Sequence, residues 1–456
     1  MKKTLLHLMT LGCPKNQVDS RQIQGMLLEK GYVFTNSPQE AEIILLNTCG
    51  FVDDAKEESI QAILDLSRWK KKGRCRYLIV LGCLVQKYGD ELAEALPEVD
   101  LFLGVTDWVK LQAHLDALAS TLGGKREGQR LQIGSPDQHL FSNEWAMQSA
   151  EEPCGYVKIA EGCDHHCTFC VIPQIRGGYR SRPLNSIKEE VAARVAKGLR
   201  EAVLVAQDTG AYGRDLTPAA SLAELLQELC AIQGLERVRI MYCYPEGVDE
   251  ALLEAMKHPK VCPYLDMPIQ HVDDTVLRTM ARPISSSRLK DVITSLRRHI
   301  PDIVIRTTLM VGFPGETEKA FQALLEFLEE FHLERVGFFA FSPQPGTPAE
   351  KLPNQIAEAE KERRLELAQE KQSQVLEQWH DSLVGKVLSV FIDERDREKA
   401  DLYHYEGRTC WDAPEIDGLV TFSSKELLSP GQLVDVRITH SRDYILSGEI
   451  ANESSQ

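Results

Sequence analysis

Three cysteines lie close together in residues 161–170, which read Glu-Gly-Cys-Asp-His-His-Cys-Thr-Phe-Cys. Cys163, Cys167 and Cys170 have C-x₃-C-x₂-C spacing, which can supply thiolates to three irons of a four-iron–four-sulfur cluster. An electron-transfer cluster of this type takes four thiolates, and a structural zinc site also takes four protein ligands. Three ligands leave one iron open. The motif therefore predicts a cluster whose fourth iron can bind a small molecule.

A zinc site is the alternative interpretation of this loop, with His165 or His166 as the fourth ligand. Both histidines lie inside the loop, where they are poorly placed to close a tetrahedron. The loop also follows an apolar strand predicted at 156–160, and active sites of α/β barrels lie at the carboxyl ends of strands. We therefore favour the cluster.

A second set of cysteines follows three predicted strands near the start of the chain. Cys13, Cys49 and Cys83 come after the apolar runs 5–11, 43–46 and 77–81. Ligands of open α/β sheets bind beyond the carboxyl ends of the strands, so these three thiols could meet at one metal site. Free cysteine is also among the most buried residue types, so the pattern alone leaves a structural role equally open. The other six cysteines show no ligand spacing, and we interpret them as structural: Cys75, Cys154, Cys230, Cys243, Cys262 and Cys410.

Polar residues and glycines follow two strands of the second α/β region. Gln207 comes after the strand predicted at 202–206, where the segment 207–210 provides either hydrogen bonds to a ligand or a helix N-cap. Gly312 and Gly315 follow the strand predicted at 304–311 and permit close approach of the backbone to a cofactor. An ordinary strand-to-helix turn is the alternative for the two glycines.

Three arginines, Arg176, Arg180 and Arg182, come soon after the cysteine loop. They could bind an acidic group of a substrate, but we interpret them as a solvated basic face.

Composition restricts the class of protein. The chain has 456 residues, twelve cysteines and a net charge of −16. That length suits two or three domains, and the negative charge disfavours broad nucleic-acid binding. We find no secretory signal and no apolar run of the ~18 residues that a membrane span needs, so we expect a cytoplasmic protein with no membrane contact. Cysteine use in such a chain favours metal ligation over disulfides.

The hydrophobic pattern divides the chain into an α/β architecture with a β-rich end. Residues 1–118 alternate strand and helix as in a doubly wound sheet, and 119–148, with the glycine-rich segment 123–128, are predicted to be a linker. Residues 149–380 predict six strands in a partial (β/α) barrel, ending in one long helix at 355–380. Residues 382–450 predict a small all-β barrel.

With these motifs in place, the chain resembles the methylthiotransferase family of radical S-adenosylmethionine (SAM) enzymes along essentially its whole length. The resemblance implies two four-iron–four-sulfur clusters. One, on Cys163, Cys167 and Cys170, cleaves SAM. The other, on Cys13, Cys49 and Cys83, carries the sulfur that is methylated and transferred. It also implies that Phe169, Gln207, Gly312 and Gly315 contact SAM, and that the last domain is a TRAM barrel.

Four segments resemble the branch of this family that modifies an aspartate of ribosomal protein S-twelve: 12–20, 207–213, 264–271 and 412–418. The other branch modifies an adenosine of tRNA and usually has Gln-Met-Asn after the first cysteine, where this chain has Pro14-Lys15-Asn16. Residues 384–456 carry eight Lys or Arg against fourteen Asp or Glu, which suits a basic protein partner better than tRNA. Departures from the branch include Arg21, Gly178 and Cys410-Trp411.

We therefore predict a transferase that adds a methylthio group to the β-carbon of an aspartate in ribosomal protein S-twelve, with tRNA adenosine as the alternative substrate. SAM cleavage takes an electron, so we expect an electron donor such as flavodoxin or ferredoxin, and the resemblance implies a monomer. A non-catalytic iron–sulfur carrier is the rival from another class, but three-thiolate spacing disfavours it because a carrier gains nothing from an open iron.

Overall fold

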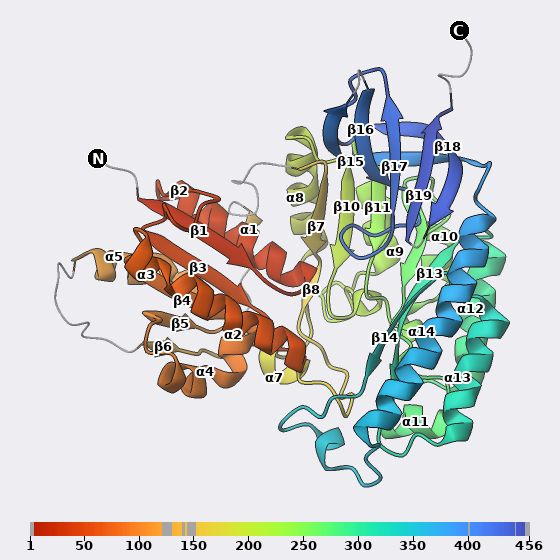
Figure 1. Cartoon of the computed structure of the whole chain (residues 1–456), viewed down its shortest axis with the longest axis horizontal. Helices are drawn as coiled ribbons and strands as arrows, with labels where there is room; N and C mark the ends of the chain where they lie inside the picture. Colours follow the sequence, from red (N-terminus) through yellow and green to blue (C-terminus); the bar gives the residue numbers. More distant parts are fainter. Residues whose placement is uncertain are drawn as a thin grey trace.

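Two parallel α/β sheets and one closed β-barrel make up the chain, arranged as in Figure 1. The structure, a computed structural model, describes residues 4–120, 130–138, 142–143, 152–399, 402–442 and 444–451. This α/β architecture with a terminal barrel confirms the predicted fold class. Within the described residues, no helix combines the length and apolarity that crossing a membrane requires.

The N-terminal sheet has six parallel strands in the order β2-β1-β3-β4-β5-β6. Its central strand β3 (Ile43–Thr48) is buried at every position, as expected for a parallel strand covered on both faces. The other strands are β1 (Leu5–Thr10), β2 (Val33–Phe34), β4 (Tyr77–Gly82), β5 (Leu101–Leu103) and β6 (Leu131–Gln132). The helices are α1 (Pro14–Glu29), α2 (Asp53–Ser67), α3 (Trp69–Lys72), α4 (Cys83–Ala95) and α5 (Leu111–Ser120), with the 3-10 turn η1 (Asp107–Lys110).

Strand β6 lies inside the segment 119–148 that the sequence predicts to be a linker. It pairs in parallel with β5, so this part of the segment belongs to the N-terminal sheet. The glycine-rich residues 123–128 lie outside the described residues. The domain bounds themselves remain predictions.

The central sheet also has six parallel strands, in the order β14-β13-β12-β11-β10-β7. Strands that are neighbours in this sheet also follow one another along the chain, and helices connect them. This is the arrangement of a (β/α) barrel that is left open between β7 and β14. The strands are β7 (Cys154–Lys158), β10 (Glu201–Val205), β11 (Arg237–Ile240), β12 (Val261–Asp266), β13 (Val304–Val311) and β14 (Arg335–Ala340); a two-stranded ribbon, β8 (Ala160–Glu161) and β9 (Arg180–Ser181), adjoins them.

Helices cover this central sheet. Among them, α13 (Glu318–Phe331) begins at Thr317, whose side chain accepts a hydrogen bond from the Ala320 N–H, and buries one apolar face. The long predicted helix is α14 (Glu358–Asp381), which packs beside α13 and β14. The remaining helices are α7 (Ile172–Arg176), α8 (Leu184–Ala196), α9 (Leu222–Cys230), α10 (Glu250–Ala255), α11 (Asp274–Thr279) and α12 (Ser286–His299), with the short 3-10 turns η2 (Thr209–Ala211), η3 (Pro245–Gly247) and η4 (Pro348–Lys351).

The C-terminal barrel closes in the order β15-β16-β17-β19-β18 and stands above the central sheet in Figure 1. Closure leaves no unpaired sheet edge in this small unit. Its apolar interior includes Val390, Ile392, Val420, Val436 and Ile438. The strands are β15 (Val387–Lys399), β16 (Leu402–Arg408), β17 (Leu419–Ser424), β18 (Leu433–Arg442) and β19 (Ile445–Ile450).

Candidate active site

The carboxyl edge of the N-terminal sheet brings together Cys13, Cys49 and Cys83. Cys13 precedes α1, Cys49 follows β3, and Cys83 is the first residue of α4. A Cβ atom added to Gly12 would lie 2.6 Å from Cβ and 2.9 Å from Sγ of Cys49, so only glycine leaves room for this approach. Burial raises the pKa of Cys83 to about 12; Arg176 opposes this, while Cys13 and Cys49 add to it. The three thiols are therefore close enough to interact electrostatically.

Asn16 fixes the start of α1 against the strand ends beside these cysteines. Its side-chain amide donates to the carbonyls of Leu11 at 2.9 Å and Thr48 at 3.0 Å, and its Oδ1 lies 3.7 Å from Sγ of Cys83. Asn16 is fully buried. The position of Cys13, just before α1, is thereby tied to the neighbouring strand β3.

The cysteines of the C-x₃-C-x₂-C motif lie in the loop after β7 and β8 of the central sheet. Cys163 and Cys167 are buried, and Cys170 is partly buried. Gly162 enters the loop with φ +81°, and a Cβ there would lie 1.9 Å from the carbonyl oxygen of Gly178. Burial raises the pKa of Cys170 to about 12, and the neighbouring Cys167 and Cys163 add to this effect. The loop therefore gathers three interacting thiols, and their role as cluster ligands remains a prediction.

The donor set of each triad suits a multi-iron cluster better than a single ion. A tetrahedral zinc about 2.3 Å from each sulfur needs sulfurs within roughly 4 Å of one another. In the described part of the chain, neither cysteine triad brings all three sulfurs within 4.8 Å. A cluster places each thiolate on a separate iron, so it accepts wider spacing.

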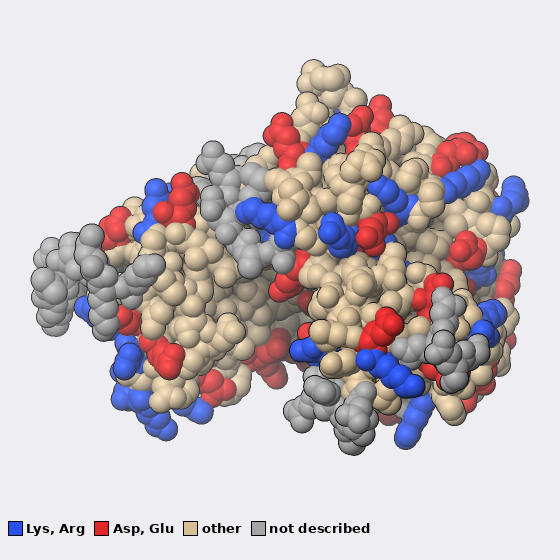
Figure 2. All heavy atoms as spheres, turned by 90° about the horizontal axis from the view of Figure 1, so that it is seen from above, with Lys and Arg blue, Asp and Glu red and all other residues tan. Residues whose placement is uncertain are grey.

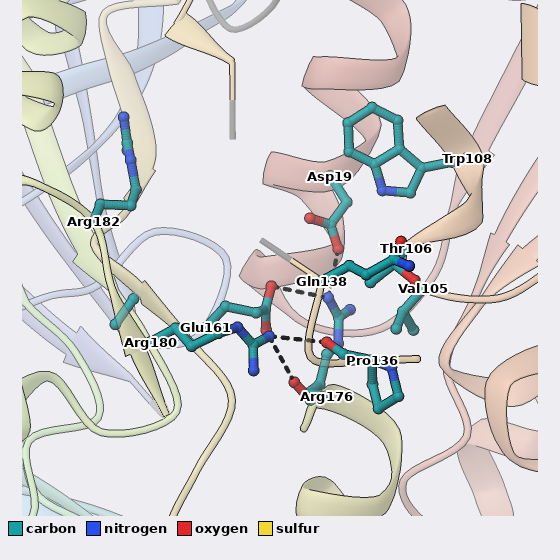
Figure 3. A pocket seen from close by; sticks show the side chains of 11 residues that line it. Asp19, Val105, Thr106, Trp108, Pro136, Gln138, Glu161, Arg176, Arg180 and Arg182 are labelled. Carbon is teal, nitrogen blue, oxygen red and sulfur yellow. Dashed lines mark hydrogen bonds and ion pairs between the residues drawn. The ribbon is translucent and has the colours of Figure 1, made fainter. Parts of the chain in front are cut away.

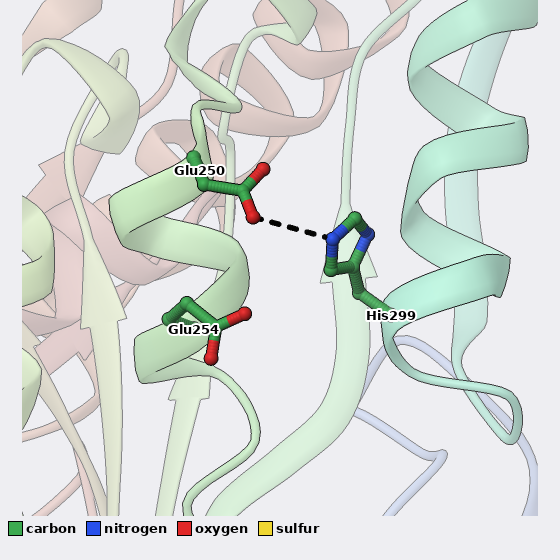
Figure 4. A group of neighbouring side chains, drawn as sticks. All are labelled: Glu250, Glu254 and His299. Atoms are coloured by element: carbon green, nitrogen blue, oxygen red, sulfur yellow. Dashed lines mark ion pairs between the residues drawn. The ribbon is translucent and has the colours of Figure 1, made fainter.

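One other group among the described residues does bring three potential ligand atoms within 4.8 Å: Glu250, Glu254 and His299 (Figure 4). Both glutamates are exposed, and Glu254 already pairs with Lys257. We assign this group no metal.

The side chain of His165 is held by contacts with Asp208 and Tyr244, outside the cysteine triad. Its Nε2 lies 2.9 Å from the carboxylate of Asp208, and its ring stacks on Tyr244 with centroids 4.2 Å apart. Arg282 lies 4.1 Å from the centroid of the same Tyr244 ring, and its Nη1 reaches Sγ of Cys167 at 3.9 Å. These contacts disfavour His165 as a zinc ligand. Spacing in the sequence gave no signal for Tyr244 or Arg282, because they come from two other loops of the sheet.

The predicted SAM contacts lie around the same end of the central sheet. Phe169 meets Phe313 edge to face at 6.3 Å, and Phe313 directly follows Gly312. Gly312 and Gly315 have φ +72° and +84°, and a Cβ on Gly312 would lie 2.4 Å from Cγ of Lys361. Gln207 donates to Glu161 at 2.8 Å. Phe169 and Gly312 are thus brought together, while Gln207 contacts the start of the cysteine loop; their roles as SAM contacts remain predictions.

The interpretation of Arg176, Arg180 and Arg182 as a solvated basic face is wrong for two of the three. Arg176 is 4% exposed and Arg182 is 1% exposed. Arg182 forms a buried ion pair with Glu190 at 2.7 Å. Arg180 is partly buried and lies 3.3 Å from Asp137. A run of arginines is normally solvated, but here Arg176 is buried against Asp19 of the N-terminal domain and Arg182 against Glu190 of α8.

Arg176 bridges the two cysteine sites. Its Nη1 donates to Asp19 of α1 at 2.7 Å and to Glu161 of β8 at 3.3 Å, as Figure 3 shows. Its Nη2 donates to Sγ of Cys83 at 3.2 Å. Lys158 completes the network through Asp19 and, at 2.6 Å, Glu161.

Burial would raise the pKa of Glu161, but Lys158 and Arg176 outweigh it and hold the pKa well below its ordinary value. Asp19, Glu161 and Arg176 also line a small cavity of about 30 Å³ between the two domains (Figure 3).

Three family models match the chain in succession. They are Uncharacterized protein family UPF0004 over residues 5–104, the Radical SAM superfamily over 157–328 and the TRAM domain over 384–451. Among solved structures, the radical SAM methyltransferase TsrM from Kitasatospora setae is 14% identical, with a TM-score of 0.54, covering 76% of this chain and 77% of that one. The cobalamin-dependent SAM radical enzyme OxsB has a TM-score of 0.51 at 11% identity, covering 81% of this chain and 56% of its own. These solved structures show only that the fold is shared. The matched Radical SAM model indicates the class of protein, a radical SAM enzyme.

Relatives with closer sequences extend over nearly the whole chain. The proteins named ribosomal protein uS12 methylthiotransferase RimO from Desulforamulus reducens and Geobacter sulfurreducens are each 42% identical, over 97% and 98% of this chain and 99% of their own. The same-named protein of Clostridium botulinum is 41% identical over the full length of both. The chain belongs to the RimO family of methylthiotransferases. This membership confirms the predicted enzyme class, a transferase that uses SAM and iron–sulfur clusters.

Proposed function

We propose that this chain attaches a methylthio group to the β-carbon of an aspartate in ribosomal protein uS12, the S-twelve of the sequence prediction. The observation that carries the proposal is the pair of cysteine triads, one at the carboxyl edge of each parallel sheet, with Arg176 between them. Methylthio transfer needs two separate centres, one to activate carbon and one to deliver sulfur. The names of the full-length relatives support uS12 as the substrate.

In this proposal Cys163, Cys167 and Cys170 hold the cluster that cleaves SAM, and Cys13, Cys49 and Cys83 hold the auxiliary cluster. When bound, SAM and the clusters supply a radical that can remove hydrogen from an unactivated carbon, and the sulfur that replaces it. The residues of the chain position these groups and exclude water. Arg282 beside Cys167 and Arg176 beside Cys83 offset the negative charge of thiolate ligands.

SAM itself is proposed to lie along the edge formed by Phe169, Gln207, Gly312 and Gly315. Phe169 and Phe313 offer an apolar surface suited to an adenine ring. Gly315 has open space beside its backbone, whereas Lys361 fills the space beside Gly312. Gln207 holds the Glu161 carboxylate at 2.8 Å, so it orients the first residue of the cysteine loop.

The alternative substrate, a tRNA adenosine, is less consistent with the charge of the barrel. Residues 384–456 carry eight basic against fourteen acidic side chains. On the face in Figure 2, the described Lys and Arg side chains are interspersed with Asp and Glu. A surface that grips phosphates should instead gather Lys and Arg. A basic ribosomal protein is the better electrostatic match.

Two further parts of the proposal concern partners. Cleavage of SAM consumes an electron, so we propose a donor of the flavodoxin or ferredoxin class. We also propose that the chain acts as a monomer, which light scattering of the reconstituted protein would test.

Separate removal of the two triads tests the proposed division of labour. The variant Cys13→Ala/Cys49→Ala/Cys83→Ala should still cleave SAM but form no methylthio product, whereas Cys163→Ala/Cys167→Ala/Cys170→Ala should do neither. Circular dichroism would establish that both variants are folded. Loss of SAM cleavage in the folded first variant, or product formed without its three thiols, would contradict the assignment.

A further inference from the structure

Arg176 links the two halves of the active site through four side chains. It belongs to α7, six residues after Cys170, yet its guanidinium donates to Asn16 at 2.6 Å and to Sγ of Cys83 at 3.2 Å in the N-terminal domain. The other side of the guanidinium donates to Asp19 at 2.7 Å and to Glu161 at 3.3 Å. Arg176 is 4% exposed, so these contacts are made out of water. A planar guanidinium with five fixed donors can satisfy all four acceptors at once.

The charges around Arg176 indicate a role for its guanidinium group. Asp19, Glu161, Lys158 and Arg176 form a buried group of two negative and two positive charges. The net charge of these four side chains is zero, without any thiolate. Arg176 also places a donor 3.2 Å from Sγ of Cys83, a ligand of the proposed auxiliary cluster. A guanidinium that reaches a ligating thiol from a neighbouring domain is suited to a cluster whose sulfurs carry negative charge.

We propose that Arg176 is a positioning residue that holds Cys83 as a ligand of the auxiliary cluster and raises the reduction potential of that cluster. The proposal rests on the auxiliary cluster of the proposed function. Hydrogen bonds to ligating sulfurs and nearby positive charge stabilise the more negative, reduced form of a cluster, and both are recognised determinants of its potential. Because Arg176 comes from the SAM domain, the potential of the sulfur-delivering centre depends on how the two domains dock.

The potential can be measured in a full-length chain that binds only the auxiliary cluster, the Cys163→Ala/Cys167→Ala/Cys170→Ala parent. Into this parent are placed Arg176→Gln, Arg176→Lys and the charge-balanced pair Arg176→Gln/Asp19→Asn. Arg182→Gln is the matched control, because Arg182 is equally buried and ion-paired in the same segment, while Glu190 keeps its second partner Arg194 at 3.1 Å. Each protein is reconstituted without oxygen, its iron is counted, and its midpoint potential is titrated by electron paramagnetic resonance.

We expect Arg176→Gln to keep about four irons and to titrate at a more negative potential than the parent. The potential of Arg176→Lys should shift less, because lysine keeps the positive charge but not the planar set of N–H donors. The potential of Arg182→Gln should equal that of the parent. The charge-balanced pair should also keep its iron and titrate below the parent, since it too lacks the donor to Cys83.

An unchanged potential in an iron-loaded Arg176→Gln would overturn the proposal. So would an equal shift, or an equal loss of iron, in Arg182→Gln, because the effect would then be one of general packing. A parent that binds no iron would instead contradict the auxiliary cluster itself. The two failures are therefore distinguishable.

Discussion

Arg408, the last residue of barrel strand β16, donates a hydrogen bond at 3.1 Å to Glu201, the first residue of core strand β10. Glu201 is fully buried and Arg408 is 4% exposed. Arg239 also donates to Glu201, at 2.8 Å. Burial acts to raise the pKa of Glu201, but Arg408, Arg239 and Arg237 outweigh it and lower the pKa to about 2. The barrel is thus joined to the SAM core by a buried ionic network, so the two should unfold together.

Replacement of Glu201 by Gln should therefore destabilise the whole chain. It leaves the buried guanidinium of Arg239 without its carboxylate and leaves Arg408 with Asp393 alone. Breaking a buried ion pair in this way typically costs about 3–5 kcal/mol. Urea unfolding followed by tryptophan fluorescence would show a lower midpoint. Glu254→Gln, at an exposed pair with Lys257, is the control and should leave the midpoint unchanged. Equal midpoints for the two variants would contradict the network.

Protonation of His271 should weaken the fold in mild acid. His271 is fully buried, its Nδ1 accepts from the Asp273 N–H at 3.0 Å, and burial lowers its pKa to about 4. Between pH 6.5 and about 4, the unfolded chain binds a proton here that the folded chain does not. Stability should therefore be complete above pH 6.5 and fall as the pH drops towards 4. A shift of this size corresponds to about 3 kcal/mol.

Urea midpoints measured from pH 7.5 down to pH 5 would reveal this slope. His271→Gln should flatten it in that range. A slope identical in the variant and the unsubstituted chain would show that another group is responsible.

Substitution of Gly12 should disable the auxiliary site selectively. Alanine at Gly12 would meet Cys49 at 2.6 Å and would have to adopt φ +90°. Gly31, in the same domain, has φ +86° but no atom within 4 Å of an added Cβ. Both alanines carry a similar backbone penalty of about 1 kcal/mol, so a difference between them isolates the collision. Gly12→Ala should lose about half of its iron, the four atoms of one cluster, while Gly31→Ala keeps it all. Equal iron in both variants would argue against Cys49 as a ligand.

The parts of this architecture that the sequence could predict are those with local signals. The Cys163–Cys167–Cys170 spacing, the apolar strands and the alternating β18 pattern all lie within short windows, and the predicted fold class followed from them. The burial of Arg176 could not be predicted in this way. Its partner Asp19 is 157 residues away, and the run of arginines by itself has the pattern of a solvated face. Strand β6 has two residues, too few to show a period.

Trp411 illustrates the same limit. The sequence shows it only as a departure from the family pattern, next to Cys410. In the structure its ring packs against Trp379 at the end of α14, with centroids 6.1 Å apart. Its place between the barrel and the core follows from the docking of the two units, which no pattern within either one encodes.

The central claim is best tested by one anaerobic experiment on the reconstituted, unsubstituted chain. Iron per chain is measured, and then a uS12 peptide containing the target aspartate and a tRNA are incubated in parallel with SAM and a reductant. We expect about eight irons and a methylthio mass gain on the peptide alone. About four irons, or a modified tRNA beside an untouched peptide, would contradict it.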